Sequence, residues 1–150
     1  MKTLYVSDLD GTLLQSNAKI SEYTNRTING LIEKGMLFSY ATARSYLTAC
    51  KVTAGLRTDI PLVVYNGAAL VDGGDGSPMR KNFFGGEIGE VLTDLFANDV
   101  YPIVYAFLDG EEKFSYIPAR CTSGMDAFLE SRAGDRRTHP VADEDGLLQG

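Results

Sequence analysis

The sequence has no tryptophan, a single histidine and only two cysteines among its 150 residues. Cys50 and Cys121 lie far apart and form no CxxC pair, so reduced thiols are expected, with a disulfide or a metal role as the less favoured alternative. No stretch approaches the roughly 20 apolar residues of a membrane helix, and the apolar run within residues 1–11 is too short for a signal peptide. These absences predict a cytoplasmic protein that does not bind membranes.

Positively charged residues are also fewer than negatively charged ones. The formal net charge is -6, with 14 Lys and Arg against 20 Asp and Glu. This balance argues against nucleic acid or an anionic membrane as the main partner. A small anionic substrate stays compatible with it, because a local cation or a metal can dominate one site. The hydrophobic share of 44% and the charged share of 23% are those of a folded chain of about one domain.

Apolar runs alternate with amphipathic segments in the first part of the chain. The pattern predicts strands at 3–7, 36–42 and 62–65, with helices at 21–35 and 43–56 between them. Such alternation is typical of an α/β fold, a Rossmann-like parallel sheet with helices on both faces. Because ligands bind beyond the carboxyl ends of parallel strands, we expect the polar residues that follow the three strands to converge.

The pattern changes after Gly67. It predicts a hairpin over 68–84, a helix over 85–100, a second hairpin that turns at Asp109-Gly110 and a helix over 122–134, while residues 135–150 are polar and weakly patterned. A boundary near residues 84–86 divides the chain into 1–85 and 86–150.

The stretch Asp8-Leu9-Asp10-Gly11-Thr12 follows the first apolar strand. Two carboxylates this close repel each other unless a cation lies between them or one is protonated. Mg²⁺ would relieve that repulsion, since it prefers oxygen ligands. Gly11 allows a turn whose backbone N–H groups can cradle an anion. A carboxylate can attack phosphorus, and its neighbour can transfer the protons, so the stretch indicates phosphoryl chemistry.

This stretch resembles the first motif of the haloacid dehalogenase (HAD) superfamily, an apolar strand followed by DxDGTLL. The resemblance implies that Asp8 is the nucleophile and Asp10 the general acid and base. It also implies that the Asp8 carboxylate and the Asp10 carbonyl bind Mg²⁺. Thr42 matches the second motif, whose hydroxyl binds the transferring phosphoryl group. Arg44 follows it, and Ala43 replaces the glycine of the Thr-Gly-Arg found in many relatives.

The Asn66-Gly67 pair resembles the loop that lines the active site in the Cof-type branch, class IIB, although a plain Asn-Gly turn is the alternative. We therefore group Gly11, Thr42, Ala43, Arg44, Asn66 and Gly67 as substrate-binding candidates. The segment between Asp8 and Thr42 has room for a loop and one helix. The cap domain of the family is therefore expected after the third strand, with 86–150 as a partial α/β cap that excludes water and selects substrate.

Two features of the family have no counterpart in the sequence: a third-motif lysine and a fourth-motif acidic pair. Asp143, Glu144 and Asp145 lack the preceding apolar strand, and Lys81 and Lys113 lie in hairpins. The chain is therefore expected to be an N-terminal portion, poorly active or inactive alone, of a phosphatase acting on a sugar phosphate, nucleotide or cofactor phosphate. A phosphomutase and a non-catalytic interaction fragment remain alternatives. Self-association or a complementary partner chain is expected to cover the exposed sheet edge.

The remaining polar candidates are assigned to the surface or to packing. His139 is expected at the surface. The arginines are expected on a solvated face, with contact to a substrate anion as the alternative: Arg132, Arg136 and Arg137. The tyrosines are expected to pack, with substrate stacking as the alternative: Tyr101, Tyr105 and Tyr116.

Overall fold

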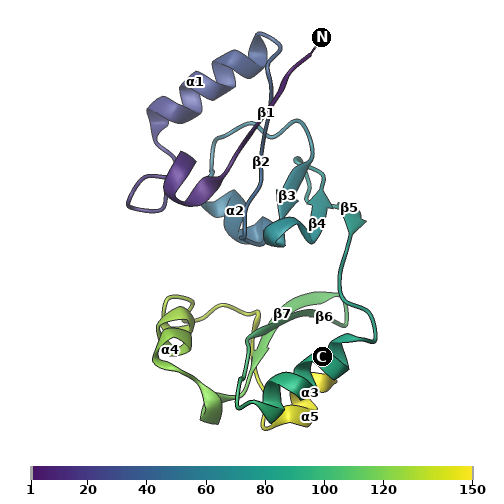
Figure 1. The fold of residues 1–150 in the computed structure, drawn as a ribbon. Coiled ribbons are helices and arrows are strands. Elements are labelled where there is room, and N and C mark those ends of the chain that lie inside the picture. Colours follow the sequence, from purple (N-terminus) through teal and green to yellow (C-terminus); the bar gives the residue numbers. More distant parts are fainter. Residues whose placement is uncertain (1, 150) are drawn as a thin grey trace. The chain divides into compact units, whose positions relative to one another are not determined.

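The computed structural model describes residues 2–149 and divides into two compact units, one that ends at Phe83 and one that begins at Phe84. Figure 1 shows both, with the first unit in purple to teal and the second in green to yellow. Within residues 2–149, no helix combines the length and the apolar character needed to span a bilayer.

The first unit opens with a parallel strand pair. β1 (Leu4–Ser7) pairs with β2 (Leu37–Tyr40), with Leu4 opposite Leu37 and Ser7 opposite Tyr40. A parallel bridge from Ala41 to Val63 continues the sheet to β3 (Leu62–Val64). The crossover segments hold α1 (Glu22–Glu33) and α2 (Tyr46–Val52) (Figure 1). The predicted α/β fold with a parallel sheet and helices is confirmed.

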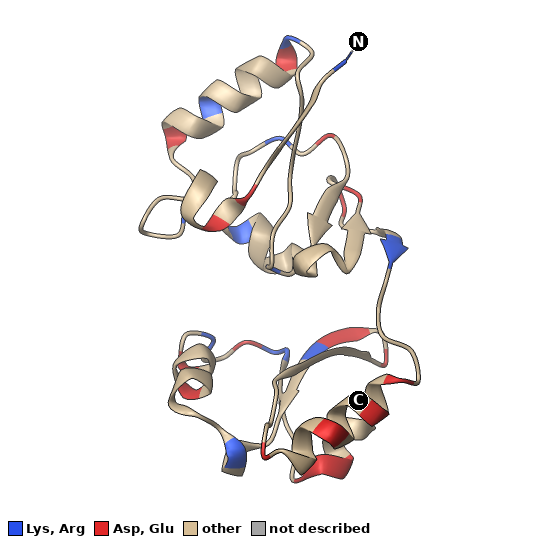
Figure 2. Ribbon diagram, in the orientation of Figure 1, with Lys and Arg blue, Asp and Glu red and all other residues tan. Residues whose placement is uncertain are grey.

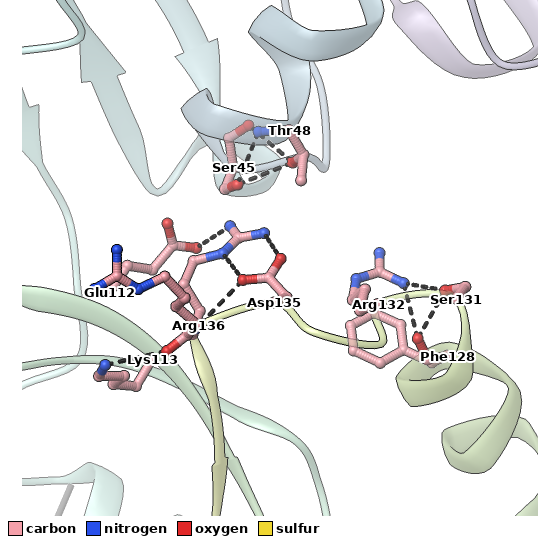
Figure 3. Close-up of polar contacts among 10 residues, drawn as sticks. Ser45, Thr48, Glu112, Lys113, Phe128, Ser131, Arg132, Asp135 and Arg136 are labelled. Atoms are coloured by element: carbon pink, nitrogen blue, oxygen red, sulfur yellow. Dashed lines mark hydrogen bonds and ion pairs between the residues drawn. The ribbon is translucent and has the colours of Figure 1, made fainter.

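Local chemistry sets the ends of these helices. The Ser21 hydroxyl accepts a hydrogen bond from the Thr24 N–H, and Ser45 caps α2 in the same way through Thr48 (Figure 3). Gly35 follows α1 with a φ of 95°, the left-handed conformation that ends helices.

An antiparallel hairpin completes the first unit. β3 pairs with β4 (Ala69–Val71), which pairs with β5 (Pro78–Lys81). Strand, helix and loop residues from the whole unit form one core, with these side chains fully buried: Leu9, Tyr40, Ala49, Leu62 and Val64. Because Leu9 lies between the two candidate aspartates, the core holds the segment that carries them.

The second unit is a three-stranded sheet with helices. In chain order its elements are α3 (Ile88–Ala97), β6 (Val104–Leu108), β7 (Glu111–Tyr116), a 3₁₀ turn (Pro118–Arg120), α4 (Ser123–Glu130), β8 (Thr138–Pro140) and α5 (Glu144–Leu148). β6 and β7 are antiparallel and β8 is parallel to β7. The core contains Leu92, Phe96, Ile117 and Leu147.

The last segment is more ordered than its sequence indicates. Residues 135–150 show weak local patterning, yet they supply β8 and α5. Leu147 is 1% exposed within the core that α3 lines, so a long-range contact rather than local periodicity holds α5 in place. His139 lies on β8, half-buried, with its Nδ1 3.0 Å from the Ser115 hydroxyl. The expectation of a surface histidine was therefore wrong.

Arg137 is the other correction in this segment, since it is buried rather than solvated. Its guanidinium donates to both Asp135 oxygens, at 2.9 and 2.6 Å, and to Glu112 Oε1 at 3.1 Å. Only 11% of its side chain and 7% of that of Glu112 are exposed. The hydrogen bonds to Asp135, followed by the charges of both acids, raise the pKa of Arg137 above its usual range. The network ties β7 to the segment that leads into β8.

We predict that Arg137→Ala lowers the free energy of unfolding by about 3 kcal/mol, because it leaves the buried Glu112 carboxylate without this guanidinium. Arg136→Ala is the matched control, since Arg136 is the exposed neighbour and its side chain lies outside the network. Urea unfolding followed by circular dichroism measures both. Equal losses for the two variants would show that the network contributes nothing specific.

Candidate active site

Three strand ends meet at one edge of the first unit. The Ala41 N–H donates to the Ser7 carbonyl at 2.9 Å, and the Thr42 N–H donates to the Val63 carbonyl at 3.0 Å. Asp8 follows the end of β1, and Thr42 lies just beyond β2. The structure therefore places the polar residues that follow β1, β2 and β3 at the edge where parallel sheets bind ligands.

Asp8 begins a tight turn over Leu9–Leu13, in which Asp10 (φ -74°, ψ 123°) and Gly11 (φ 76°, ψ 0°) have non-helical backbone angles. Asp8 Oδ1 accepts the Leu9 N–H at 2.7 Å, and the Leu14 N–H closes the turn onto the Leu9 carbonyl at 2.9 Å. Gly11 has a φ of 76°, which an L side chain rarely adopts. Leu9 is fully buried while Asp8 and Asp10 are exposed, so the turn directs both carboxylates outward.

Asp10 forms a two-pronged ion pair with Arg44. Arg44 Nε donates to Asp10 Oδ2 at 2.8 Å, and Nη2 donates to Oδ1 at 2.7 Å. These hydrogen bonds, opposed by partial burial and reinforced by the charge of Arg44, lower the pKa of the Asp10 carboxyl. The same hydrogen bonds raise the pKa of Arg44. Sequence reasoning named both residues but no contact between them, and no local pattern could have indicated it.

Thr42 is buried, with 4% of its surface exposed. Its Oγ1 accepts the Arg44 N–H at 3.2 Å, which leaves the hydroxyl proton available to a ligand oxygen. Ala43 is exposed and its φ is not positive, so the missing glycine of the Thr-Gly-Arg pattern strains nothing. The departure from the family motif is therefore accommodated.

The loop after β3 holds three consecutive residues with positive φ: 52° at Tyr65, 54° at Asn66 and 93° at Gly67. Two backbone hydrogen bonds tie it to the loop after β2, from the Tyr65 N–H to the Arg44 carbonyl and from the Asn66 N–H to the Thr42 carbonyl, both at 3.0 Å. Asn66 and Gly67 are exposed, as a ligand-contacting pair would need to be.

A hollow of about 330 Å³ lies beside this loop, and Gly67, Arg80 and Asn82 are among its lining residues. Sequence reasoning missed Arg80 and Asn82 as residues near the site. They belong to the hairpin strand β5 and its end, where a polar residue usually signals only exposure. The pairing of β5 with β4, a long-range contact, brings them beside Gly67.

The Asp8 carboxylate and the Asp10 carbonyl offer the hard oxygen donors that Mg²⁺ prefers. Within residues 2–149 there is no group of three or more His, Cys, Asp or Glu that could hold a metal. Because Mg²⁺ is commonly held by one or two carboxylates together with water and substrate phosphate, the donor type fits while the protein ligands are few. Asp143 has a separate role, since its Oδ1 accepts the Gly146 N–H at the start of α5.

The arrangement as a whole suits acyl-phosphate chemistry. An exposed carboxylate, a second carboxylate paired with a guanidinium, and a buried hydroxyl lie on loops that share backbone hydrogen bonds. These are the groups that nucleophilic attack, proton transfer and anion binding require.

Comparison with known proteins identifies the family of the chain. The family model of the haloacid dehalogenase-like hydrolases matches residues 5–139. A putative phosphatase from Buchnera aphidicola is 39% identical over 72 residues, which are 48% of this chain and 26% of that protein. The HMP-PP phosphatase of Serratia proteamaculans is 33% identical over 72 residues, 48% of this chain and 26% of its own length. The matched segment thus spans about a quarter of the length of these curated relatives.

Solved structures share the fold over the whole chain. A HAD superfamily phosphatase from Bacteroides thetaiotaomicron has a TM-score of 0.70 at 20% identity and covers 100% of this chain and 53% of that one. A sugar phosphatase of HAD subclass IIB has a TM-score of 0.67 at 16% identity, over 100% of this chain and 55% of that one. The chain therefore belongs to the haloacid dehalogenase-like hydrolases.

Proposed function

We propose that this chain is part of a Mg²⁺-dependent phosphate monoester hydrolase that acts through an aspartyl-phosphate at Asp8. The observation that carries the proposal is the meeting of Asp8, Asp10 and Thr42 at the carboxyl ends of β1 and β2. The names of the relatives support a phosphatase. The whole protein's activity is a proposal, because this chain spans a minor share of those relatives.

The reaction begins at Asp8. The Leu9 N–H holds Oδ1, which leaves Oδ2 to attack the phosphorus as the ester P–O bond breaks. Asp10, in its protonated form, gives its proton to the departing alkoxide. Asp10 then takes a proton from water, which attacks the aspartyl-phosphate, releases inorganic phosphate and restores the Asp8 carboxylate.

Substrate binding is assigned to the loops around these carboxylates. We propose that the Thr42 hydroxyl and the Arg44 guanidinium bind phosphoryl oxygens, and that the backbone N–H groups of Gly11 and Ala43 add donors. The exposed Asn66-Gly67 loop lines the same edge. Mg²⁺, held by the Asp8 carboxylate and the Asp10 carbonyl, would neutralise the charge between nucleophile and phosphate.

The proposed substrates are small phosphorylated metabolites: a sugar phosphate, a nucleotide or a cofactor phosphate. The printed names of two relatives, an HMP-PP phosphatase and a sugar phosphatase, support this class. We propose that residues from 86 onward act as a partial cap that selects among them. Figure 2 shows acidic residues gathered on α3 and α5 of that unit, which speaks against a nucleic acid as partner.

We predict that, in the whole protein of which this chain is proposed to be part, Asp8→Asn lowers Mg²⁺-dependent hydrolysis of p-nitrophenyl phosphate about 10³-fold or more, because the amide cannot form the aspartyl-phosphate. Asp94→Asn, an exposed change on α3, serves as the control. The measured quantity is a ratio of rates, so a slow absolute rate suffices. Retained activity in Asp8→Asn, or no beryllium fluoride adduct at Asp8 in the whole protein, would contradict the mechanism.

We predict different outcomes for two changes at Thr42. Thr42→Val removes the hydroxyl at constant shape and lowers kcat/KM about 100-fold, as loss of one donor to the transferring group does. Thr42→Ser keeps the hydroxyl and stays within about tenfold of the unchanged chain. Steady-state kinetics with the same substrate compare them. If valine and serine behaved alike, the hydroxyl would have no role in binding phosphate.

A second candidate function, association through β1, is favoured by a separate observation. Among residues 2–149, β1 pairs with β2 and with no other strand, so its other edge is open. Leu4, Tyr5 and Val6 are between 52% and 54% exposed. An apolar edge strand without a blocking charge is a template for pairing. We propose that a second copy or a complementary chain covers it.

We predict that Tyr5→Lys shifts the protein toward the monomer, because an edge lysine opposes strand pairing. Tyr23→Lys is the control, since Tyr23 is 70% exposed on α1, away from a strand edge. Size-exclusion chromatography with light scattering reports the mass. A monodisperse monomer for the unchanged chain at high concentration would remove the basis for association.

A further inference from the structure

The contact between Asp10 and Arg44 conflicts with the proton transfer proposed for Asp10. Both of its oxygens accept hydrogen bonds from the guanidinium, at 2.7 and 2.8 Å. To exchange a proton with a leaving oxygen or with water, one of those oxygens has to face the substrate, and the two-pronged guanidinium engages both of them. Opening of the pair would free one oxygen for that exchange.

The backbone of Arg44 does not supply that opening. Its N–H donates to Thr42 Oγ1 at 3.2 Å, and its carbonyl accepts the Tyr65 N–H at 3.0 Å. Both partners sit at strand ends of the sheet. The guanidinium lies at the end of a long side chain that is 24% exposed, and the Asp10 side chain is 53% exposed. Rotation of the Arg44 side chain is the motion that frees Asp10.

We propose that the phosphoryl group of the substrate takes the Arg44 guanidinium from Asp10, so that Asp10 becomes available only when substrate is bound. This inference rests on the proposed function. A phosphoryl group offers oxygens that match the guanidinium fork as a carboxylate does, and it carries more charge. The backbone bonds of Arg44 hold its Cα beside Thr42, the other proposed phosphoryl contact.

The exchange has a consequence for the free protein. While Arg44 is paired with Asp10, the carboxylate proposed to activate water is engaged by the guanidinium. The site is therefore inactive until an anion binds. The alternative is a permanent ion pair, in which Arg44 only positions Asp10. In that case binding of an anion would leave the Asp10–Arg44 pair intact. The exchange and the permanent ion pair can be distinguished by a double-mutant cycle. The cycle measures how far the effect of changing Asp10 on phosphate affinity depends on the presence of Arg44.

The experiment measures the affinity of inorganic phosphate for the 150-residue chain in MgCl₂ by calorimetry, for the unchanged chain, Asp10→Asn, Arg44→Gln and the double variant. Asp10→Asn keeps the Asp10 carbonyl and frees Arg44, so phosphate should bind about fivefold more tightly, the scale of an exposed ion pair. In the Arg44→Gln background the same change should gain less than about twofold. Asp10→Asn deletes the same negative charge in both backgrounds. The difference between the two gains in phosphate affinity therefore reports the release of Arg44.

A second measurement follows the guanidinium in the unchanged chain. The Arg44 Nε–H signal in ¹⁵N-correlated NMR, assigned by its loss in Arg44→Gln, should move on addition of phosphate. In Asp10→Asn it should start from a different position. Equal gains in both backgrounds, or a signal that saturating phosphate leaves unmoved, would overturn the exchange. Neither readout needs the covalent step, so failure of the Asp8→Asn test would reject the hydrolase while leaving this result to stand or fall separately.

Discussion

The parallel pairing of β1 with β2 is the constraint on which the site depends. Because Ser7 lies opposite Tyr40, the chain leaves both strands at the same level, and the Ala41 N–H still reaches the Ser7 carbonyl. A shift of one residue in this register would turn every side chain of β1 to the other face of the sheet. The observed register brings the segments that carry Asp8, Asp10 and Thr42 to the same edge of the sheet.

Charge crowding is the second constraint, and packing causes it. Leu9 is fully buried in the core, so its two neighbours, Asp8 and Asp10, both face solvent. Repulsion between them is reduced on one side by Arg44, which reaches Asp10 from the loop after β2. The core thus holds the nucleophile candidate in place, while an exposed ion pair, which is weak and easily exchanged, balances its neighbour.

The sequence predicted most of what short-range chemistry decides. Alternation of apolar and amphipathic segments predicted the sheet and a helix over 21–35, close to the observed α1. The missed features all depend on contacts between distant segments. Arg44 meets Asp10 across 34 positions, and Arg137 meets Glu112 across 25. No local pattern distinguishes an arginine that will be buried in a network from one that stays in solvent.

The loop after β3 shows why the site could be anticipated only in part. Asn66-Gly67 is a pair that tolerates left-handed backbone, whereas Tyr65 is not, and its φ of 52° costs about 1–3 kcal/mol. The hydrogen bonds to the carbonyls of Thr42 and Arg44 offset that strain. They also join the backbones of the two loops. The groups proposed to bind phosphate therefore lie on a backbone that these hydrogen bonds hold, and the proposed exchange requires only rotation of the long Arg44 side chain.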